Sequence, residues 1–213
     1  MAEKKIIPSA ECEKNAYAQL YEEEFDGNSI LSVPLGYSGV IWKNAYDFEL
    51  LSPGEYELSK YLPKEKKLFG GGKIHGKIGY VNKEISYKVD WGTGQPVVYF
   101  DKTLDRAVKV AFSGSFRVKV DMDEPFLQYA RGKALKAIKL EEMVSEQAGE
   151  FVNGLAPALK APIEKLALDF RHIPANLSEI AQAAQVRIRP VFSKMGLWLE
   201  DFAVTGCMFP ENE

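Results

Sequence analysis

The sequence predicts an α+β protein in which a curved, mostly antiparallel sheet packs against three to four helices. Short apolar runs separated by turn residues fill the first half of the chain, helical periodicity fills residues 123–195, and a last strand-like run covers 197–204. Strands followed by helices differ from the strand and helix alternation that is typical of parallel sheets. Each predicted element rests on its own local pattern of residues.

Residues 11–26 are acidic and carry apolar side chains at helical spacing, namely Ala16, Tyr17, Leu20 and Tyr21. Gly27 and Asn28 follow as a stop signal, so we predict a short leading helix here. From Ser29 the pattern changes to apolar runs with turn residues between them, which is typical of a β meander. The predicted strands cover residues 30–33, 39–42, 48–51, 78–81, 85–91 and 96–100, and the run Gly70-Gly71-Gly72 interrupts them.

The clearest strand runs from Val108 to Val120, where apolar residues alternate with polar and basic ones. This period of two predicts one buried face and one hydrated, basic face. Gly114 falls on the buried face at the centre of the strand. A glycine there permits a bend or a bulge, so we expect a curved strand.

After Asp121 the apolar period changes from two to 3.6, which predicts three helices. The first begins at Asp123-Glu124-Pro125 and ends near Gly132, and acidic residues with proline suit a helix start. The second has an apolar stripe from Leu140 to Leu159, with Pro157 and Pro162 expected to kink or end it. The third runs from Leu177 to Met195 and contains Pro190.

The composition indicates a soluble globular chain. The 213 residues are 46% hydrophobic and 27% charged, which excludes wholesale disorder and fibrous structure. No apolar run approaches the ~20 residues that a membrane span needs, and no apolar stretch of a secretory signal follows Lys4 and Lys5, so we expect a cytoplasmic protein. The net charge of -3 argues against a nucleic-acid binder. Cys12 and Cys207 lack metal-ligand spacing and are expected to be reduced thiols.

Motifs that resemble reactive sites fail on spacing. In Gly70-Gly71-Gly72-Lys73, the four residues that separate the first glycine from Gly-Lys in a phosphate-binding loop are missing, and no Ser or Thr follows the lysine. Gly36-Tyr37-Ser38-Gly39 is one residue shorter than a nucleophile elbow, so we expect a hairpin turn there. We therefore predict no catalytic residue, no cofactor and no metal.

Isolated polar and aromatic residues also have simple structural explanations. His75 and His172 are expected at the surface or bonded to a partner, because neither has metal-ligand spacing. Asp101 and Asp105 resemble paired carboxylates, but in a turn they are expected to bond their own backbone. The three tryptophans are expected to be core or interface anchors. These are Trp42, Trp91 and Trp198.

One segment departs from the acidic average. Residues 60–90 hold eight lysines and three acids. Lysines near an anionic membrane attract it, so the segment is a candidate contact for a membrane or a partner; a solvated, lysine-rich hairpin is the alternative. The candidate contact residues are Lys64, Lys66, Lys67, Lys73 and Lys77.

Several ordered motifs resemble a known family. Residues 32–41 and Leu50-Leu51-Ser52-Pro53-Gly54 resemble the opening of the SPFH (band seven) domain of stomatins, prohibitins and flotillins. The set that follows resembles the bacterial virion-core-protein-like subfamily. It consists of Leu68 to Gly72, Tyr80 to Lys83, Trp91 to Thr93, Tyr99 to Asp101, Gly114 to Val118, Glu124 to Phe126 and Gly196 to Val204.

This resemblance implies domain limits and a role. It places an acidic lead-in at residues 1–28, the SPFH-like domain at 29–205 and a tail at 206–213. It implies a non-catalytic scaffold or protein-interaction module that forms homo-oligomers and associates peripherally with the inner face of the cell membrane. The implied partners are proteins and not nucleic acid. Unlike many relatives, the chain shows neither an apolar membrane hairpin nor a long coiled coil, so contact through surface charge or a partner is expected. A self-associating docking module without lipid affinity, and a small-ligand-binding domain, remain alternatives.

Overall fold

A computed structural model describes residues 5–43, 47–62, 73–131 and 137–210 of the chain. The chain forms two compact units, and each combines separate stretches of sequence. Unit 1 comprises residues 1–86 and 119–142, and unit 2 comprises residues 87–118 and 143–213. The predicted limits at residues 28 and 205 describe a family domain rather than compact units, and they stay a prediction.

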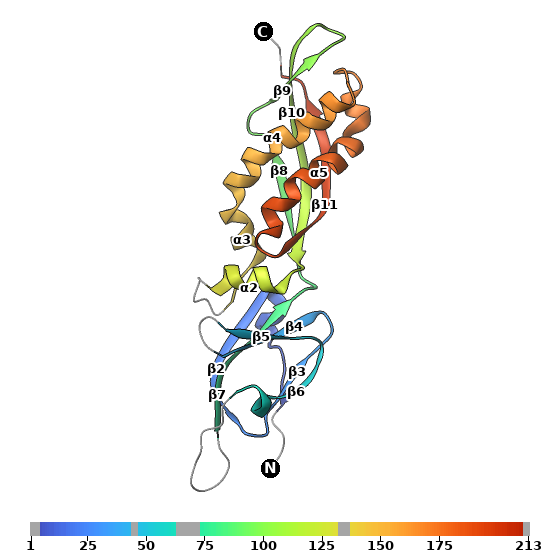
Figure 1. Ribbon diagram of the computed structural model, residues 1–213. Coiled ribbons are helices and arrows are strands. Elements are labelled where there is room, and N and C mark those ends of the chain that lie inside the picture. Colours follow the sequence, from blue (N-terminus) through green and yellow to red (C-terminus); the bar gives the residue numbers. More distant parts are fainter. Residues whose placement is uncertain (1–4, 44–46, 63–72, 132–136, 211–213) are drawn as a thin grey trace. The chain divides into compact units, whose positions relative to one another are not determined.

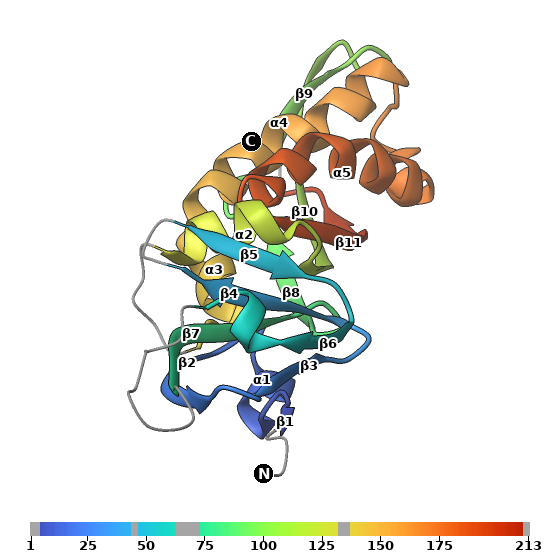
Figure 2. The same ribbon diagram turned by 60° about the horizontal axis from the view of Figure 1, so that its bottom comes forward.

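Unit 1 is built around two sheets, which Figures 1 and 2 show from two sides. The larger has the order β2-β7-β4-β5 and is antiparallel throughout. The smaller has the order β1-β3-β6, with a parallel first pair and an antiparallel second pair. The strands are β1 (Lys5–Ile6), β2 (Tyr17–Asp26), β3 (Ile30–Val33), β4 (Tyr37–Trp42), β5 (Phe48–Leu51), β6 (Gly54–Glu57) and β7 (Lys73–Asn82).

One hydrophobic cluster joins the two sheets of unit 1. Leu31 and Val33 enter it from β3, and Ile41, Ile78 and Tyr80 enter it from β4 and β7. The single O–H of Tyr80 is shared between the carbonyl oxygens of Ile6 at 3.0 Å and Ser32 at 3.1 Å. Both acceptors belong to the smaller sheet, Ile6 on its edge strand β1 and Ser32 on its central strand β3, so this buried phenol is satisfied and links the sheets.

Strand β4 is buried on both of its faces. Every residue from Ser38 to Trp42 is buried, and Ile41 points into the cluster between the sheets. On the other face, the Ser38 hydroxyl donates to Asp123 Oδ2 at 2.8 Å, the first residue of α2 (Asp123–Arg131). Helix α2 thus begins at this second face, and because β4 is buried on both faces, its sequence is a continuous apolar run rather than an alternating one.

Unit 2 is built around one sheet with the order β11-β10-β8, in which β9 also pairs with β10. Burial along β10 alternates almost residue by residue, as its sequence predicts. On the buried face, the Phe116 ring contacts Phe151 of α4 and Phe192 of α5, with centroids 5.0 and 5.2 Å away. The elements are β8 (Ser86–Gly92), β9 (Val97–Asp101), β10 (Arg106–Val120), α3 (Leu140–Glu146), α4 (Ala148–Lys165), α5 (Leu177–Ser193) and β11 (Leu197–Met208).

Gly114 is required by close packing at the centre of this sheet. A Cβ atom there would lie 1.9 Å from the Ala203 carbonyl oxygen and 2.7 Å from the Trp91 ring. The rings of Trp91 and Phe202, from the strands on either side of β10, stack with centroids 5.2 Å apart. The glycine therefore makes room for the neighbouring backbone and an aromatic ring, a reason that the alternating pattern does not reveal.

The predicted leading helix over residues 11–26 is wrong for most of its length. Helix α1 (Ala10–Lys14) is only five residues long, and the chain then enters β2, which pairs with β7 apart from an irregularity between Ala18 and Tyr21. A helix this short is marginal in isolation, whereas the strand gains a ladder of backbone hydrogen bonds from β7. Long-range pairing therefore overrides a weak local helical pattern.

The prolines do not end the second predicted helix. The break lies at Gln147, between α3 and α4, and α4 continues through Pro157 and Pro162 to Lys165. The third predicted helix is confirmed as α5, with Pro190 inside it. Buried apolar contacts of both helices outweigh the single backbone hydrogen bond that each proline removes.

The predicted α+β class is confirmed. The described residues contain five α-helices and mostly antiparallel strands, with two short 3₁₀ turns, η1 (Leu58–Lys60) and η2 (Ile173–Asn176). The strands are divided among three sheets rather than one. Strands β3 and β4 explain this difference, because the turn between them carries the chain from one sheet to the other instead of closing a hairpin.

Candidate functional site

The lysine-rich segment lies only partly within the described residues. Lys64, Lys66 and Lys67 fall outside them, as does the glycine run 70–72. Lys73 and Lys77 lie on β7, where their backbones pair with Asp26 and Glu22 of β2. Lys77 is exposed. The role predicted for these five lysines stays a prediction.

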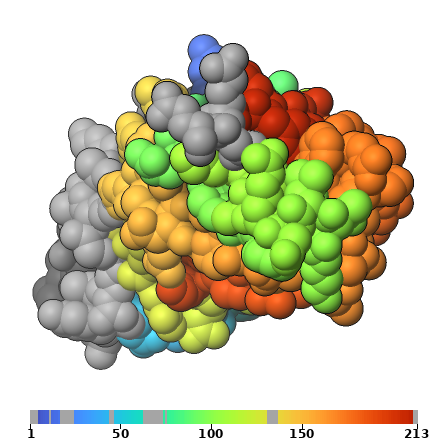
Figure 3. Space-filling view, turned by 90° about the horizontal axis from the view of Figure 1, so that it is seen from above, coloured from blue at the N-terminus to red at the C-terminus, as the bar shows by residue number. Residues whose placement is uncertain are grey.

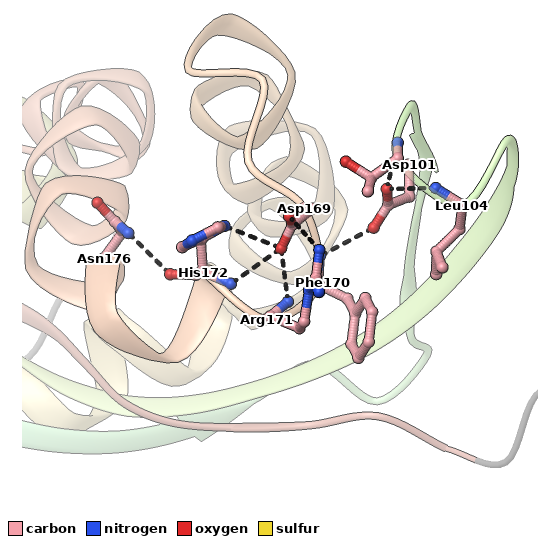
Figure 4. Close-up of polar contacts among 8 residues, drawn as sticks. Asp101, Leu104, Asp169, Phe170, Arg171, His172 and Asn176 are labelled. Carbon is pink, nitrogen blue, oxygen red and sulfur yellow. Dashed lines mark hydrogen bonds and ion pairs between the residues drawn. The ribbon is translucent and has the colours of Figure 1, made fainter.

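A polar cluster in unit 2 is centred on two aspartates (Figure 4). Asp101, at the end of β9, is fully buried. Its Oδ1 accepts the backbone N–H of Thr103 at 2.9 Å and of Leu104 at 3.1 Å, and its Oδ2 accepts the Phe170 N–H at 2.8 Å. A buried carboxylate needs such donors to offset its lost hydration. Asp101 thus fixes the β9–β10 turn and ties it to the segment after α4.

The sequence-based interpretation of Asp101 is confirmed in part. It bonds the backbone of its own turn, as expected. Asp105 has a left-handed φ of 51° in the same turn, and its expected bond to its own backbone stays a prediction. The bond to Phe170, which lies 69 residues away, has no signal in the sequence. Only the tertiary structure brings these two segments together.

Asp169 organises the connection between α4 and η2. Its Oδ1 accepts the backbone N–H groups of Arg171 and His172, and its side chain also pairs with Arg171 Nη2 at 3.2 Å and His172 Nδ1 at 2.9 Å. Burial opposes ionisation of Asp169, but the hydrogen bonds from Arg171 and the nearby charges of His172 and Arg171 outweigh it and lower its pKa. His172 is therefore bonded to a partner, as predicted.

The end of α4 shapes a small pocket beside this cluster. The Leu168 N–H bonds the Ile163 carbonyl and the Ala167 N–H bonds the Glu164 carbonyl, which is the Schellman arrangement. Ala167 takes the left-handed position of this motif, with a φ of 50°. A pocket of about 250 Å³ lies between this helix end and the β9–β10 turn, with Phe100 and Lys102 on its hairpin side. This volume is below the range of about 300–1,000 Å³ for ordinary ligand sites.

A second pocket lies in unit 1, beside the start of α2. Lys83 Nζ lies 2.8 Å from Asp123 Oδ2, the same atom that accepts the Ser38 hydroxyl. These residues line a pocket of about 210 Å³ together with Leu50 and Tyr37. Because Ser38 donates to a carboxylate that Lys83 also contacts, the trio holds a helix end in place rather than activating the hydroxyl as a nucleophile.

The turn beside this second pocket explains the Gly36-Tyr37-Ser38-Gly39 motif. The Tyr37 N–H bonds the Pro34 carbonyl at 3.2 Å, and Gly36 has a φ of 81°, as a type II turn requires. The turn thus begins earlier than the motif. Burial raises the pKa of Tyr37, and electrostatic interactions with Cys12, Glu13 and Glu84 raise it further.

The tryptophans and cysteines can also be compared with their predicted roles. Trp42 and Trp91 are buried in the core, as expected, whereas Trp198 is partly exposed and lies against Arg189, whose guanidinium is 4.1 Å from the ring centroid. Cys12 and Cys207 are both free thiols, as predicted, and burial raises the pKa of Cys207. The His75 side chain lies outside the described part of the chain.

The described residues contain neither a membrane-spanning helix nor a cluster of metal ligands. Within residues 5–43, 47–62, 73–131 and 137–210, no helix is both long and apolar enough to cross a membrane. Among the same residues, no three His, Cys, Asp or Glu side chains gather in a way that could hold a metal ion.

Comparison with known proteins places the chain in a family. A comparison with curated proteins found no match. A family model described as "SPFH domain-Band 7 family" matches residues 48–213, which is most of the chain. The match spans unit 2 entirely and the later part of unit 1. The chain therefore belongs to the SPFH domain-Band 7 family.

Proposed function

We propose that this protein is a non-catalytic scaffold and protein-interaction module that self-associates and contacts the cytoplasmic face of a membrane peripherally. Family membership supports this proposal, because SPFH proteins are in general membrane-associated interaction modules. Within the family, the ordered motifs from Leu68 to Val204 favour the virion-core-protein-like subfamily. The contact would use protein partners, the lysine-rich segment or both.

The interaction role is supported by the solvent-exposed face of the unit 2 sheet. Helices α4 and α5 cover one face of β10, while Lys109, Ser113 and Arg117 are exposed on the other. A 15-residue strand with a hydrated face offers a long, rigid surface to a partner. Interaction sites are best supported on such rigid elements.

The lysine-rich segment supports the membrane part of the proposal. Each lysine close to an anionic surface contributes on the order of 1 kcal/mol of attraction, and salt screens this within about 10 Å. Five candidate lysines would therefore give weak, salt-sensitive binding. They are Lys64, Lys66, Lys67, Lys73 and Lys77.

Vesicle flotation and sedimentation test this function. We expect the protein to float with vesicles of phosphatidylserine and phosphatidylcholine at low salt, and the triple variant K64E/K66E/K67E to lose most of that binding. The matched control K14E/K139E/K160E changes the net charge equally at positions outside the segment, of which Lys14 and Lys139 are exposed and Lys160 is half-buried. Sedimentation should show species larger than 23.9 kDa at high concentration.

Different outcomes separate the alternatives. Self-association without flotation would favour a docking module that has no lipid affinity. A monomer that binds neither vesicles nor protein partners would contradict the proposal. The pockets of about 210 and 250 Å³ are the features that would favour a small-ligand-binding domain.

A further inference from the structure

The turn end of the β9–β10 hairpin concentrates exposed apolar side chains. Val98 and Phe100 on β9 are 46% and 56% exposed, and Leu104 in the turn is 37% exposed. Leu166, at the end of α4, is 49% exposed. Phe100 and Ala167 line the same pocket, so the hairpin and the helix end are neighbours. We call these four residues the hairpin-end surface.

The hairpin register explains why Val98 and Phe100 face outward together. Phe100 pairs with Ala107 and Val98 pairs with Lys109, and all four residues are exposed. The alternate residues Val97, Tyr99, Val108 and Val110 are buried. Side chains on a strand alternate between faces, so the apolar side chains of β9 cannot turn inward without breaking this register.

The hairpin end is held rigid and projects outward. Asp101 fastens the turn through Thr103 and Leu104 and fastens the hairpin to Phe170. In Figure 1 the turn extends past the end of α4, and Figure 3 looks directly onto it, with the green hairpin against the orange helix end. A fixed, projecting end presents apolar groups without an ordering cost on binding.

The charges around these apolar groups favour an anionic surface. The exposed charged residues around these apolar groups are four cations, Lys102, Arg106, Lys109 and Lys165, and two acids, Asp105 and Glu164. The second acid of the hairpin, Asp101, is buried and bonded to backbone amides. Phenylalanine and leucine flanked by lysine and arginine are the residues that enter the boundary between headgroups and acyl chains, with the cations at the headgroups.

We propose that the hairpin-end surface of unit 2 docks onto an anionic membrane, with Phe100 and Leu104 entering the headgroup boundary. This rests on the proposed peripheral membrane role but assigns the contact to a different part of the chain from the lysine-rich segment. Stable membrane attachment generally needs an apolar signal and a basic one together. The hairpin end supplies both within one rigid element.

Flotation of the full chain with matched variants tests this assignment. Phe100→Ser and Leu104→Ser remove exposed apolar groups and should each lower binding to equal mixtures of phosphatidylserine and phosphatidylcholine by at least about threefold. Leu35→Ser is the control, because Leu35 is 82% exposed in unit 1 and should leave binding unchanged. Circular dichroism and thermal unfolding should confirm that each variant is folded.

A tryptophan at the contact gives an independent measurement. F100W should shift its emission to shorter wavelength and be quenched by brominated lipids in anionic vesicles, after subtraction of the wild-type signal from Trp42, Trp91 and Trp198. Vesicles of phosphatidylcholine alone should produce neither change. A tryptophan that stays in water in bound protein would overturn the proposal.

The variants also separate this inference from the proposed function. Loss of flotation in K64E/K66E/K67E together with wild-type flotation of Phe100→Ser would reject the hairpin-end contact and keep the lysine-based one. Loss of self-association in Phe100→Ser, with vesicle binding unchanged, would identify the surface as a protein contact and also overturn the inference. Absence of wild-type flotation at low salt would reject both membrane contacts.

Discussion

Strands β4 and β10 bury their residues in opposite ways. In β4 every residue from Ser38 to Trp42 is buried: a second sheet packs on one face, and the start of α2 is bonded to Ser38 on the other. In β10 burial alternates, because α4 and α5 cover one face and the other is exposed. Unit 1 is thus closed around its central strand, whereas unit 2 keeps a face open for contacts.

The largest expected effects come from paired substitutions on the two strands. Phe116→Ala should destabilise unit 2 by about 3–5 kcal/mol, and its neighbour Arg117→Ala by less than about 0.5 kcal/mol, because only Phe116 faces the helices. On β4, Ile41→Ala should cost about 2–5 kcal/mol and Val40→Ala about 2 kcal/mol, because both neighbours are buried. Urea unfolding monitored by circular dichroism measures each change.

The two strands should differ in how substitutions at neighbouring positions change stability. Equal losses at positions 116 and 117 would show that the outer face of β10 is covered in solution. A negligible loss at Val40 would show that the second face of β4 is open. Either result would contradict the division between a closed and an open unit.

Gly114→Val should cost about 3 kcal/mol, because the new side chain would collide with the Ala203 carbonyl and the Trp91 ring. Ser113→Ala, at the adjacent exposed position, should change stability by less than about 0.5 kcal/mol. Thermal unfolding followed by near-ultraviolet circular dichroism would also report disruption of the Trp91 and Phe202 stack. A well-tolerated valine would mean that β11 does not lie this close to β10.

Acid should weaken unit 2 through Asp169. Its pKa is lowered in the folded protein, so the ionised form contributes stability above the unfolded pKa of about 3.9, and this is lost as pH falls through the folded pKa. The difference in urea midpoint between wild type and Asp169→Asn should therefore shrink as pH falls from 5 to below 4. A difference that is constant across this range would contradict the assignment.

The smallest expected effect is a stabilisation at the end of α4. Ala167→Gly should stabilise the protein by about 1 kcal/mol, because glycine adopts the left-handed conformation at this position without steric cost. Ala175→Gly, in η2, should instead be neutral or destabilising. Melting temperatures of the two variants measure the contrast, and a loss of stability in Ala167→Gly would contradict the left-handed geometry.

The sequence by itself predicted those elements whose burial is periodic. Strand β10 and helices α2 and α5 follow their patterns because each has one buried face, and the alternating or 3.6-residue period records that face directly. The Asp101 turn was predictable for a similar reason, since its first two hydrogen bonds are local. The α+β class followed from the order of these elements.

The tertiary structure decided what depends on distant partners. Residues 17–26 form a strand because β7 pairs with them, and the break at Gln147 together with the uninterrupted α4 depends on packing that overcomes its prolines. The division into three sheets, the contact of Gly114 with Ala203 and the bond from Asp101 to Phe170 join residues far apart in the chain. The local spacing of residues cannot predict such contacts, because they contribute free energy only when the two segments meet in the folded protein.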